Sequence, residues 1–524
     1  MLMLWDGGTT LLGGSSVDID RWDISTPSQR HGVDNVGMQY VTICAGQMGI
    51  SVSREESGPS GAPRLCPDRE DRDASAARLT PRMRERGRMT KSSHHLSVRS
   101  RVAKVAGGAA RFASRALGRG SGGMIGGEVA MRISPKFLSE LAAPYSSVIV
   151  TGTNGKSTTT RMVRAALESA GPVASNINGD NMTSGVITAL MQGKGATRAA
   201  LEVDEMHVPA VAADVNPAVF VYLNLSRDQL DRVGEIGSVE RRLRDGASAH
   251  PGAVVVANCD DPLIVSAAAD NPNVVWVAAG AGWGGDSAAY PRGGRVVRSG
   301  EDWHLIPAFD GEALPELSAR PQPQWWLEDV ELAPEGPRAT LRGPDGVSVP
   351  LELKLPGRAN LGNAAQAVAA AVAMGIDPAA AAAAVSSVTE VAGRYSVHDV
   401  NGRSARLMLA KNPAGWQEAM TMIDPRVDQV VIGVNGQVPD GQDLSWLWDV
   451  DFSAVKQPGR RVVACGERGA DLAVRLEYAG VHCDLVPLPM DALAACEPGR
   501  VEMLLNYTAM RDFKVLLDRK EGTR

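Results

Sequence analysis

Long apolar runs, paired cysteines and an excess of positive charge are all missing from this chain. It contains no run of about 18 apolar residues, so the sequence predicts no transmembrane helix. The six cysteines are scattered, which argues against a disulfide framework and against a four-cysteine zinc site. A formal net charge of -6 argues against a basic nucleic-acid-binding protein. The scattered cysteines also favour a reducing cytoplasm, and we observe no basic-then-apolar signal pattern at the start of the sequence.

The composition of the chain is typical of a large globular protein. Its 524 residues are enough for two or three domains, and hydrophobic residues at 44% can supply their cores. Residues 1–95 differ, because they are rich in Gly, Ser, Pro, Arg and Asp and show little apolar periodicity. Such a segment cannot bury enough apolar surface to offset its ordering entropy. We expect it to be a disordered extension or to be untranslated, with Met83 or Met89 as the start.

A strongly basic segment leads into the ordered part of the chain. Residues 82–119 contain eleven Lys and Arg against one acid, and Val98, Val102, Val105 and Ala109 recur at helical spacing. One interpretation is a basic amphipathic helix that touches an anionic membrane surface. The interpretation that we favour is a solvated first helix packed on the next domain.

The most informative stretch reads Val-Ile-Val-Thr-Gly-Thr-Asn-Gly-Lys-Ser-Thr and spans residues 148–158. A strand pattern enters a glycine turn, and helix-forming sequence follows from residue 157 to about residue 170. Backbone N–H groups of such a turn face an anion, Lys156 adds a positive charge, and the Ser157 hydroxyl can hold Mg²⁺. The alternative is an ordinary turn with an exposed lysine. We predict a nucleotide phosphate site formed by Gly152, Thr153, Asn154, Gly155, Lys156, Ser157 and Thr158.

Strand and helix patterns alternate from residue 148 onward. Apolar runs predict strands at 148–150, 199–203, 218–223, 253–257 and 274–278, hence a mainly parallel sheet with helices on both faces. Gly, Pro and Trp interrupt this rhythm at residues 281 to about 325, which we interpret as an insertion. A β-rich piece, 326–355, and two Ala-rich helices, 360–374 and 378–388, complete this domain.

A second α/β series begins after Gly393. The sequence predicts strands at 405–409, 429–434, 461–465, 483–487 and 501–505, with a helix at 469–478. We therefore predict an α/β protein with a central domain, residues 96–392, and a C-terminal Rossmann-like domain, residues 393–524.

Polar residues follow several predicted strands, where ligands bind in such folds. Glu202 ends the strand expected beside the phosphate loop, where a Mg²⁺ ligand is needed; the alternative is a polar strand end. Asp261 is interpreted as a helix N-cap. Asn360 and Asn363 share one helical turn, so they can be caps or can read a purine edge through their amides.

The order of these motifs resembles that of the Mur ligases, ATP-dependent amide-forming enzymes of peptidoglycan synthesis. The shared motifs are Gly152-Thr-Asn-Gly-Lys-Ser-Thr158, Glu202-Val-Asp204, Asn224-Leu-Ser-Arg-Asp-Gln-Leu-Asp231, Leu355-Pro-Gly-Arg-Ala-Asn-Leu-Gly-Asn-Ala364 and Gly393-Arg394. The last part of the chain is similar to the MurT branch of this family, the ligase-like subunits of lipid II isoglutaminyl synthases. Its motifs are Leu409-Ala-Lys-Asn-Pro-Ala-Gly-Trp416, Asp440-Gly-Gln-Asp-Leu-Ser-Trp-Leu-Trp-Asp449 and Asn506-Tyr-Thr-Ala509. The resemblance covers about residue 97 to the end.

This resemblance implies a central ATP-binding domain of the Mur ligase type and a specific reaction. The family amidates the α-carboxylate of D-glutamate in the lipid II stem peptide, through an acyl phosphate, to give D-isoglutamine. ATP and Mg²⁺ are implied, with Lys156, Ser157, Glu202 and Arg394 around the phosphates and Asn360 and Asn363 facing the adenine. Ammonia comes from a separate GatD-type glutaminase, which forms a heterodimer with the ligase-like subunit through the C-terminal domain. The lipid substrate implies work at the inner face of the membrane.

The motif Asp-Gly-Gln-Asp resembles the place where this family completes the glutaminase's Cys-His pair in trans. An aspartate that orients a histidine is a familiar third triad member. Asp440 and Asp443 both remain candidates; the alternative for each is a turn or a helix cap.

Three departures from the family pattern bear on the chemistry. Many members carry a four-cysteine zinc ribbon in the central domain, but residues 281–325 contain no cysteine, so we predict no zinc. Gln229 stands where amino-acid-adding Mur ligases have a histidine, as expected if ammonia is the nucleophile. No Cys-His pair here resembles a glutaminase, so nitrogen must come from elsewhere. The alternatives are a stand-alone amino-acid ligase and a non-catalytic ATP-binding scaffold.

Overall fold

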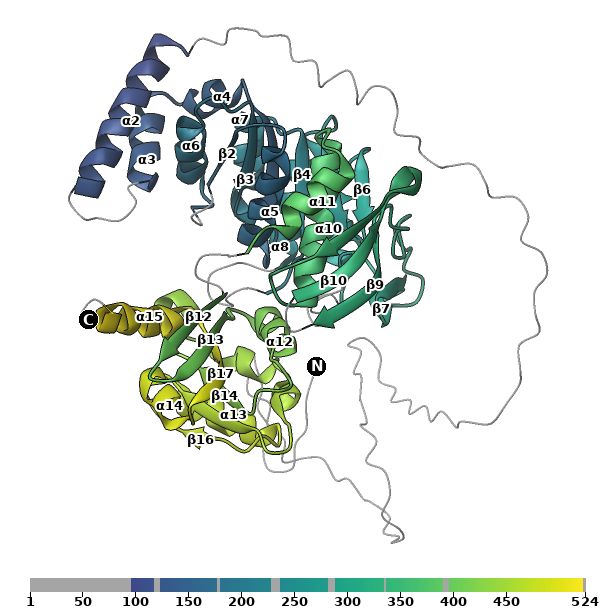
Figure 1. The fold of residues 1–524 in the computed structure, drawn as a ribbon. Coiled ribbons are helices and arrows are strands. Elements are labelled where there is room, and N and C mark those ends of the chain that lie inside the picture. Colours follow the sequence, from purple (N-terminus) through teal and green to yellow (C-terminus); the bar gives the residue numbers. More distant parts are fainter. Residues whose placement is uncertain are drawn as a thin grey trace, which may run out of the picture. The chain divides into compact units, whose positions relative to one another are not determined.

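The computed structural model describes residues 96–116, 123–176, 180–227, 236–280, 288–333, 336–389 and 395–521 (Figure 1). The predicted N-terminal extension, residues 1–95, lies outside this range. Among the described helices, none combines the length and the apolar character that a membrane span needs.

The first sheet has six strands, all of them parallel, in the order β2-β3-β1-β4-β5-β6. Its strands are β1 Ser146–Thr151, β2 Val173–Ser175, β3 Arg198–Glu202, β4 Val219–Tyr222, β5 Val254–Asn258 and β6 Val274–Val277. The predicted parallel sheet and five of its strands are confirmed. The prediction missed β2, an edge strand of three residues that is too short to show a periodic pattern.

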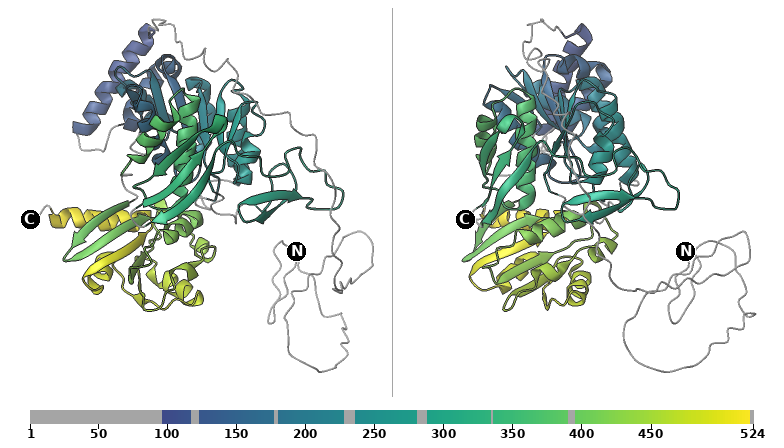
Figure 2. Two further views of the ribbon diagram at one scale, coloured as in Figure 1. Left: turned by 45° about the vertical axis from the view of Figure 1, so that its right-hand side comes forward. Right: turned by 90° about the vertical axis from the view of Figure 1, so that its right-hand side faces the viewer.

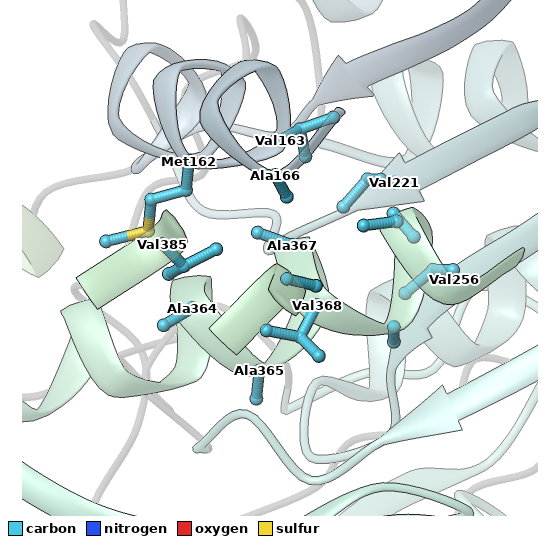
Figure 3. Close-up of a cluster of buried hydrophobic side chains, with 14 of the residues drawn as sticks. Met162, Val163, Ala166, Val221, Val256, Ala364, Ala365, Ala367, Val368 and Val385 are labelled. Atoms are coloured by element: carbon cyan, nitrogen blue, oxygen red, sulfur yellow. The ribbon is translucent and has the colours of Figure 1, made fainter. Parts of the chain in front are cut away.

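Helices cover both faces of this sheet because alternate strand residues point to opposite sides. Val148, Val150 and Val221 face one helical layer, while Ile149 and Phe220 face the other. The first layer contains α5 Lys156–Glu168, α10 Arg358–Ala373 and α11 Pro378–Ser386 (Figures 2 and 3). The second contains α4 Phe137–Ala142, α6 Thr183–Gln192, α7 Val208–Val215, α8 Ile236–Ser248 and α9 Pro262–Ala268.

The predicted insertion contains a two-stranded antiparallel hairpin, β7 Arg295–Ser299 and β8 Asp302–Ile306. Trp303 attaches this hairpin to the first sheet, because its ring is buried and its Nε1–H donates to Cys259 O at 2.9 Å. The β-rich piece that follows is an antiparallel sheet in the order β11-β10-β9, as predicted. Its elements are β9 Trp326–Ala333, β10 Gly336–Arg342, the 3-10 turn η2 Pro344–Gly346 and β11 Ser348–Glu352.

The second sheet has the order β12-β13-β17-β14-β15-β16 and is parallel except for β12, which pairs antiparallel with β13. Its strands are β12 Tyr395–Val400, β13 Arg403–Leu409, β14 Gln429–Gly433, β15 Arg461–Cys465, β16 Asp484–Leu485 and β17 Gly499–Leu505. Its helices are α12 Pro413–Thr421, η3 Val438–Asp440, η4 Ser445–Trp448, η5 Phe452–Val455, α13 Gly469–Tyr478, α14 Pro489–Ala495 and α15 Tyr507–Glu521. The predicted α/β class is therefore confirmed, and β12 is the strand that the prediction missed.

The basic segment forms the helix α2 Val98–Ala116, which packs on α3 Gly123–Ile133. The contact is very close, because a Cβ added to Gly107 would lie 2.6 Å from Gly126 O. Ser100 and Ser134 extend it through a hydroxyl contact of 3.0 Å. The favoured interpretation, a first helix packed on the rest of the chain, is correct for this face. The opposite face of α2 is exposed and apolar.

The contact between α2 and α3 predicts a difference between two neighbouring glycines. Gly107→Ala should push the helices apart and cost about 1–3 kcal/mol, since the new methyl group meets backbone. Gly108→Ala should stabilise α2 by about 0.5–1 kcal/mol, because no atom lies within 4 Å of its added Cβ. Amide hydrogen exchange of α2 measures both effects. Equal protection in the two variants would contradict the packing described here.

Candidate active site

The carboxyl ends of β3, β1 and β4 lie side by side at one edge of the first sheet. Val150 of β1 is paired with Glu202 of β3, and Thr151 is paired with Tyr222 of β4. The chain leaves β1 toward β2 but leaves β3 toward β4, so the strand order reverses between β1 and β3. Such a reversal opens a crevice beyond the strand ends, the usual ligand site in doubly wound sheets.

Two glycines shape the loop that leaves β1. Gly152 has φ 133° and Gly155 has φ 87°, both in the region that L side chains rarely adopt. Space is lacking as well, because an added Cβ at Gly155 would lie 2.8 Å from Asn363 Oδ1. Helix α5 begins directly afterwards at Lys156, one residue earlier than predicted. The predicted strand, glycine turn and helix are therefore present, with the N-terminus of a 13-residue helix at the loop.

The end of β4 holds this loop from the other side. Thr153 N–H donates to Asn224 O at 2.9 Å, and Asn154 N–H donates to Asn224 Oδ1 at 2.9 Å. Asn224 Nδ2 donates in return to Asn154 O at 3.0 Å. Ser226 N–H donates to Thr153 Oγ1 at 3.0 Å, and Asn154 Nδ2 lies 3.3 Å from Asn412 Oδ1. The polar residues Asn224 and Ser226, which follow β4, thus form hydrogen bonds with the loop between β1 and α5.

Lys156 lies inside the loop, which contradicts the alternative of an exposed lysine. Its Nζ donates to Gly152 O at 2.7 Å and to Glu205 Oε2 at 3.1 Å. Both side chains of this ion pair are only 11% exposed. The Lys156 ammonium is therefore held within the loop by the buried carboxylate of Glu205.

Glu205 is a site residue that the sequence analysis did not single out. It opens the 3-10 turn η1 Glu205–His207, whose N-cap is Asp204, with Met206 N–H donating to Asp204 Oδ1 at 3.1 Å. Burial and the Glu205 carboxylate raise the pKa of Asp204, while Lys156 opposes the shift. The signal in the sequence was a third acid, three residues past the end of β3. Its direction toward Lys156 depends on the turn that starts there.

Glu202 ends β3 as predicted, and its side chain is buried. Its backbone is fixed by Asn176, which accepts from Glu202 N–H at 2.8 Å and donates from Nδ2 to Glu202 O at 2.8 Å. Ser157 occupies the first turn of α5 and is half-buried. A hydroxyl and several carboxylates at one sheet edge are the oxygen ligands that Mg²⁺ takes, so these residues fit the predicted metal. Ligation by Ser157 and Glu202 stays a prediction.

Asn360 and Asn363 are buried in the first turns of α10. Asn360 Nδ2 donates to Pro356 O at 2.5 Å, and Asn363 Nδ2 donates to Asn360 Oδ1 at 3.3 Å. Because Asn363 also lies against Gly155, the structure brings this asparagine to the glycine loop between β1 and α5. Contact of either residue with an adenine stays a prediction.

Several predicted residues lie elsewhere. Asp261 is an N-cap of α9, as expected, and accepts from Leu263 N–H at 2.9 Å. Arg394 and Gln229 lie outside the described residues.

The two candidate aspartates of the Asp-Gly-Gln-Asp motif have different surroundings. Asp440 is buried and accepts from Thr508 N–H at 3.1 Å and from the Thr508 hydroxyl, so it caps α15. Burial raises the pKa of Asp440, and the hydrogen bonds from Thr508 oppose this shift. Asp443 is exposed and accepts from Ser445 N–H at 2.8 Å. Of the two carboxylates, the one at Asp443 is accessible from solution.

Two family models match the parts of the chain that contain these sites. The Mur ligase middle domain matches residues 150–288, and the MurT ligase C-terminal model matches residues 409–510. A subunit MurT of lipid II isoglutaminyl synthase (glutamine-hydrolyzing) from Streptococcus pneumoniae is 28% identical over 453 residues, 82% of this chain and 99% of that protein. The subunit of the same name from Staphylococcus aureus is 27% identical and covers 72% of this chain and 87% of its own length.

Solved structures agree on the fold. A UDP-N-acetylmuramoylalanyl-D-glutamyl-2,6-diaminopimelate–D-alanyl-D-alanyl ligase from Acinetobacter baumannii superposes with a TM-score of 0.56 at 17% identity, over 75% of this chain and 79% of the other. MurF ligase from Thermotoga maritima in complex with ADP has a TM-score of 0.51 at 15% identity, over 74% and 82%.

The ion pair of Lys156 and Glu205 predicts that substitutions there change folding stability and nucleotide affinity in different ways. Lys156→Met should cost about 3 kcal/mol of unfolding free energy, because it leaves the buried Glu205 carboxylate without its cation. Adding Glu205→Gln should recover most of that stability. It should not recover nucleotide affinity, which we expect to stay at least about tenfold weaker without the lysine charge.

Urea unfolding and calorimetric titration with ADP measure the two quantities in the wild type, both single variants and the double variant. The opposite pattern, in which Glu205→Gln restores ADP binding to Lys156→Met, would show that Lys156 neutralises the Glu205 carboxylate and does not bind the nucleotide phosphate.

Proposed function

From the matches to the Mur ligase middle domain and to the MurT ligase C-terminal model, we propose that this chain is a Mur ligase family member and the synthetase subunit of a lipid II isoglutaminyl synthase. In this role it is an ATP-dependent carbon–nitrogen ligase of peptidoglycan synthesis. It amidates the α-carboxylate of D-glutamate in the lipid II stem peptide to D-isoglutamine. The observation that carries the proposal is a phosphate loop with a buried Lys156 in a chain that aligns with 99% of a MurT relative.

The proposed chemistry answers a specific difficulty. A carboxylate is a poor electrophile, so the γ-phosphoryl group of ATP is first transferred to the glutamate oxygen, releasing ADP and forming an acyl phosphate. Ammonia then attacks the acyl carbon, the C–O bond to phosphate breaks, and a proton leaves the nitrogen as inorganic phosphate departs. The protein's part in such transfers is positioning and charge stabilisation.

The residues at the carboxyl edge of the first sheet are suited to positioning the phosphates and stabilising their charge. The N–H groups at the start of α5 and the Lys156 ammonium hold the phosphates, while Ser157 and Glu202 hold Mg²⁺, which neutralises developing negative charge when bound. The turn of Asp204 and Glu205 keeps the lysine side chain at the loop. We assign Arg394 to the same charge cluster and Asn360 and Asn363 to the nucleotide.

Ammonia is supplied in this proposal by a GatD-type glutaminase bound as a heterodimer partner. Asp443 is the group that completes the partner's Cys-His pair, because its carboxylate is exposed whereas Asp440 caps α15. Trp448 of the same segment and Tyr478 of α13 support a docking surface there. Trp448 is 57% exposed and Tyr478 is 76% exposed, with ring centroids 5.3 Å apart, and the Arg475 guanidinium lies 5.4 Å from the Trp448 centroid. Trp, Tyr and Arg are the residues that most often anchor protein interfaces.

The test of the proposed function uses the purified chain with ATP, Mg²⁺, lipid II and ammonium chloride, without a partner. Mass spectrometry should detect the exchange of a hydroxyl for an amino group on the glutamate. Lys156→Ala should give no product with ammonium chloride, nor with glutamine and the partner. Product that appears only after the glutaminase is added would assign the partner a role in shaping the site. No product in either case would favour a non-catalytic scaffold or another substrate.

Asp443→Asn should abolish amidation driven by glutamine and leave amidation driven by ammonium chloride unchanged. The variant keeps the shape of the side chain but loses the charge that stabilises the partner's imidazolium. Its matched control is Asp440→Ala, which removes the cap of α15. We expect it to cost about 0.5–2 kcal/mol of stability and to affect both activities alike. Full glutamine-driven activity in Asp443→Asn would exclude the assignment.

A further inference from the structure

Helix α2 presents its largest apolar side chains to solvent. Val98 is 70% exposed, Val102 54%, Val105 74% and Phe112 76%. Their spacing of four, three and seven residues places them on one stripe along the helix, together with Ala109. A helix that only packed on its neighbour would turn such a stripe inward.

The buried face of α2 is built from small residues. Ser100, Ala103, Gly107 and Ser114 are buried on the opposite side of the helix, where Gly107 lies against Gly126 of α3. The distance between Gly107 and Gly126 leaves no room for larger side chains there. One face of α2 therefore packs on α3 through small residues, and the apolar stripe on the opposite face takes no part in that interface.

Basic side chains border the exposed stripe. Arg99, Arg101 and Lys104 are exposed, and the sequence of α2 contains no Asp or Glu. This local excess contrasts with the net charge of -6 for the whole chain. Apolar side chains flanked by cations match a surface that is anionic outside and apolar beneath, which is the arrangement of an acidic phospholipid bilayer.

We propose that α2 docks the protein onto an anionic membrane surface. The helix lies in the plane of the interface over a length of about 28 Å, with Val98, Val102, Val105 and Phe112 among the upper acyl chains and the basic residues among the headgroups. Such docking would hold the ligase at the layer that contains a lipid-linked substrate. The proposal goes beyond the ligase function and does not depend on it, because vesicle binding needs neither ATP nor a partner.

The test is flotation of the full chain with vesicles of phosphatidylcholine alone or mixed with phosphatidylglycerol. The wild type should bind the mixed vesicles at least roughly tenfold more tightly, and added salt should weaken this binding. The double variant Val105→Asp/Phe112→Asp should fall to the level of phosphatidylcholine vesicles. Arg101→Glu/Lys104→Glu should lose the preference for the anionic lipid.

The control is Val474→Asp, which places one aspartate on α13 at a valine that is 49% exposed, and it should bind as the wild type does. Amide exchange of α2 in each variant shows that the helix remains folded on α3. The α2 variants should amidate lipid II in detergent micelles at the wild-type rate and lipid II in anionic vesicles more slowly.

Three outcomes would overturn the proposal. The first is a wild type that binds neither kind of vesicle, and the second is equal binding by all variants. Alternatively, sedimentation velocity could show a dimer that Val105→Asp/Phe112→Asp converts to a monomer while no vesicle binding occurs, which would assign the stripe to a second copy of the chain. Absence of amidation by a wild type that still floats with anionic vesicles would refute only the ligase function.

Discussion

The contact between Gly155 and Asn363 is the constraint on which the rest of the site depends. Gly155 needs a left-handed backbone to turn the chain from β1 into α5, and Asn363 occupies the space that a side chain would fill. This contact requires α10 to lie close against α5. Ala367 of α10, which lies beside Ala166 of α5 in Figure 3, permits that approach because its side chain adds little thickness between the helices. The shape of the glycine loop between β1 and α5 is therefore set by core packing as much as by its own sequence.

Electrostatic interactions also position the side chains of the glycine loop. Lys156 is held by the carboxylate of Glu205, which lies outside the glycine loop motif. Glu205 reaches Lys156 because β3 ends at Glu202 and the chain then turns into η1. The same turn buries Asp204, whose raised pKa reflects burial and its acidic neighbour. Several acids thus lie close to one cation at the sheet edge. An arrangement of this kind suits a site that receives both a polyphosphate and a divalent metal, since each brings charge that the other balances.

Helix α2 shows the opposite use of small residues. On α10 they allow a helix to enter the core, whereas on α2 they attach a helix to α3 and leave the large side chains outside. Amphipathic spacing alone does not distinguish these cases, because a periodic stripe has the same pattern whether it faces a core or a membrane. The interpretation of the basic segment as a helix packed on its neighbour is confirmed for one face of α2. Contact of the exposed apolar stripe with a membrane stays a proposal.

The sequence by itself determined the α/β class, ten strands of the two sheets, the glycine loop with its lysine and the resemblance to the Mur ligases, because these depend on local periodicity and on motifs with fixed spacing. It did not predict β2 or β12, since an edge strand of three residues and an antiparallel edge carry little apolar pattern. Only the tertiary structure decided that Glu205 pairs with Lys156, that Asp440 is buried while Asp443 is exposed, and which face of α2 is free. Each of these depends on what a distant segment places beside the residue, such as Thr508 beside Asp440 or Gly126 beside Gly107, and sequence spacing does not encode that proximity.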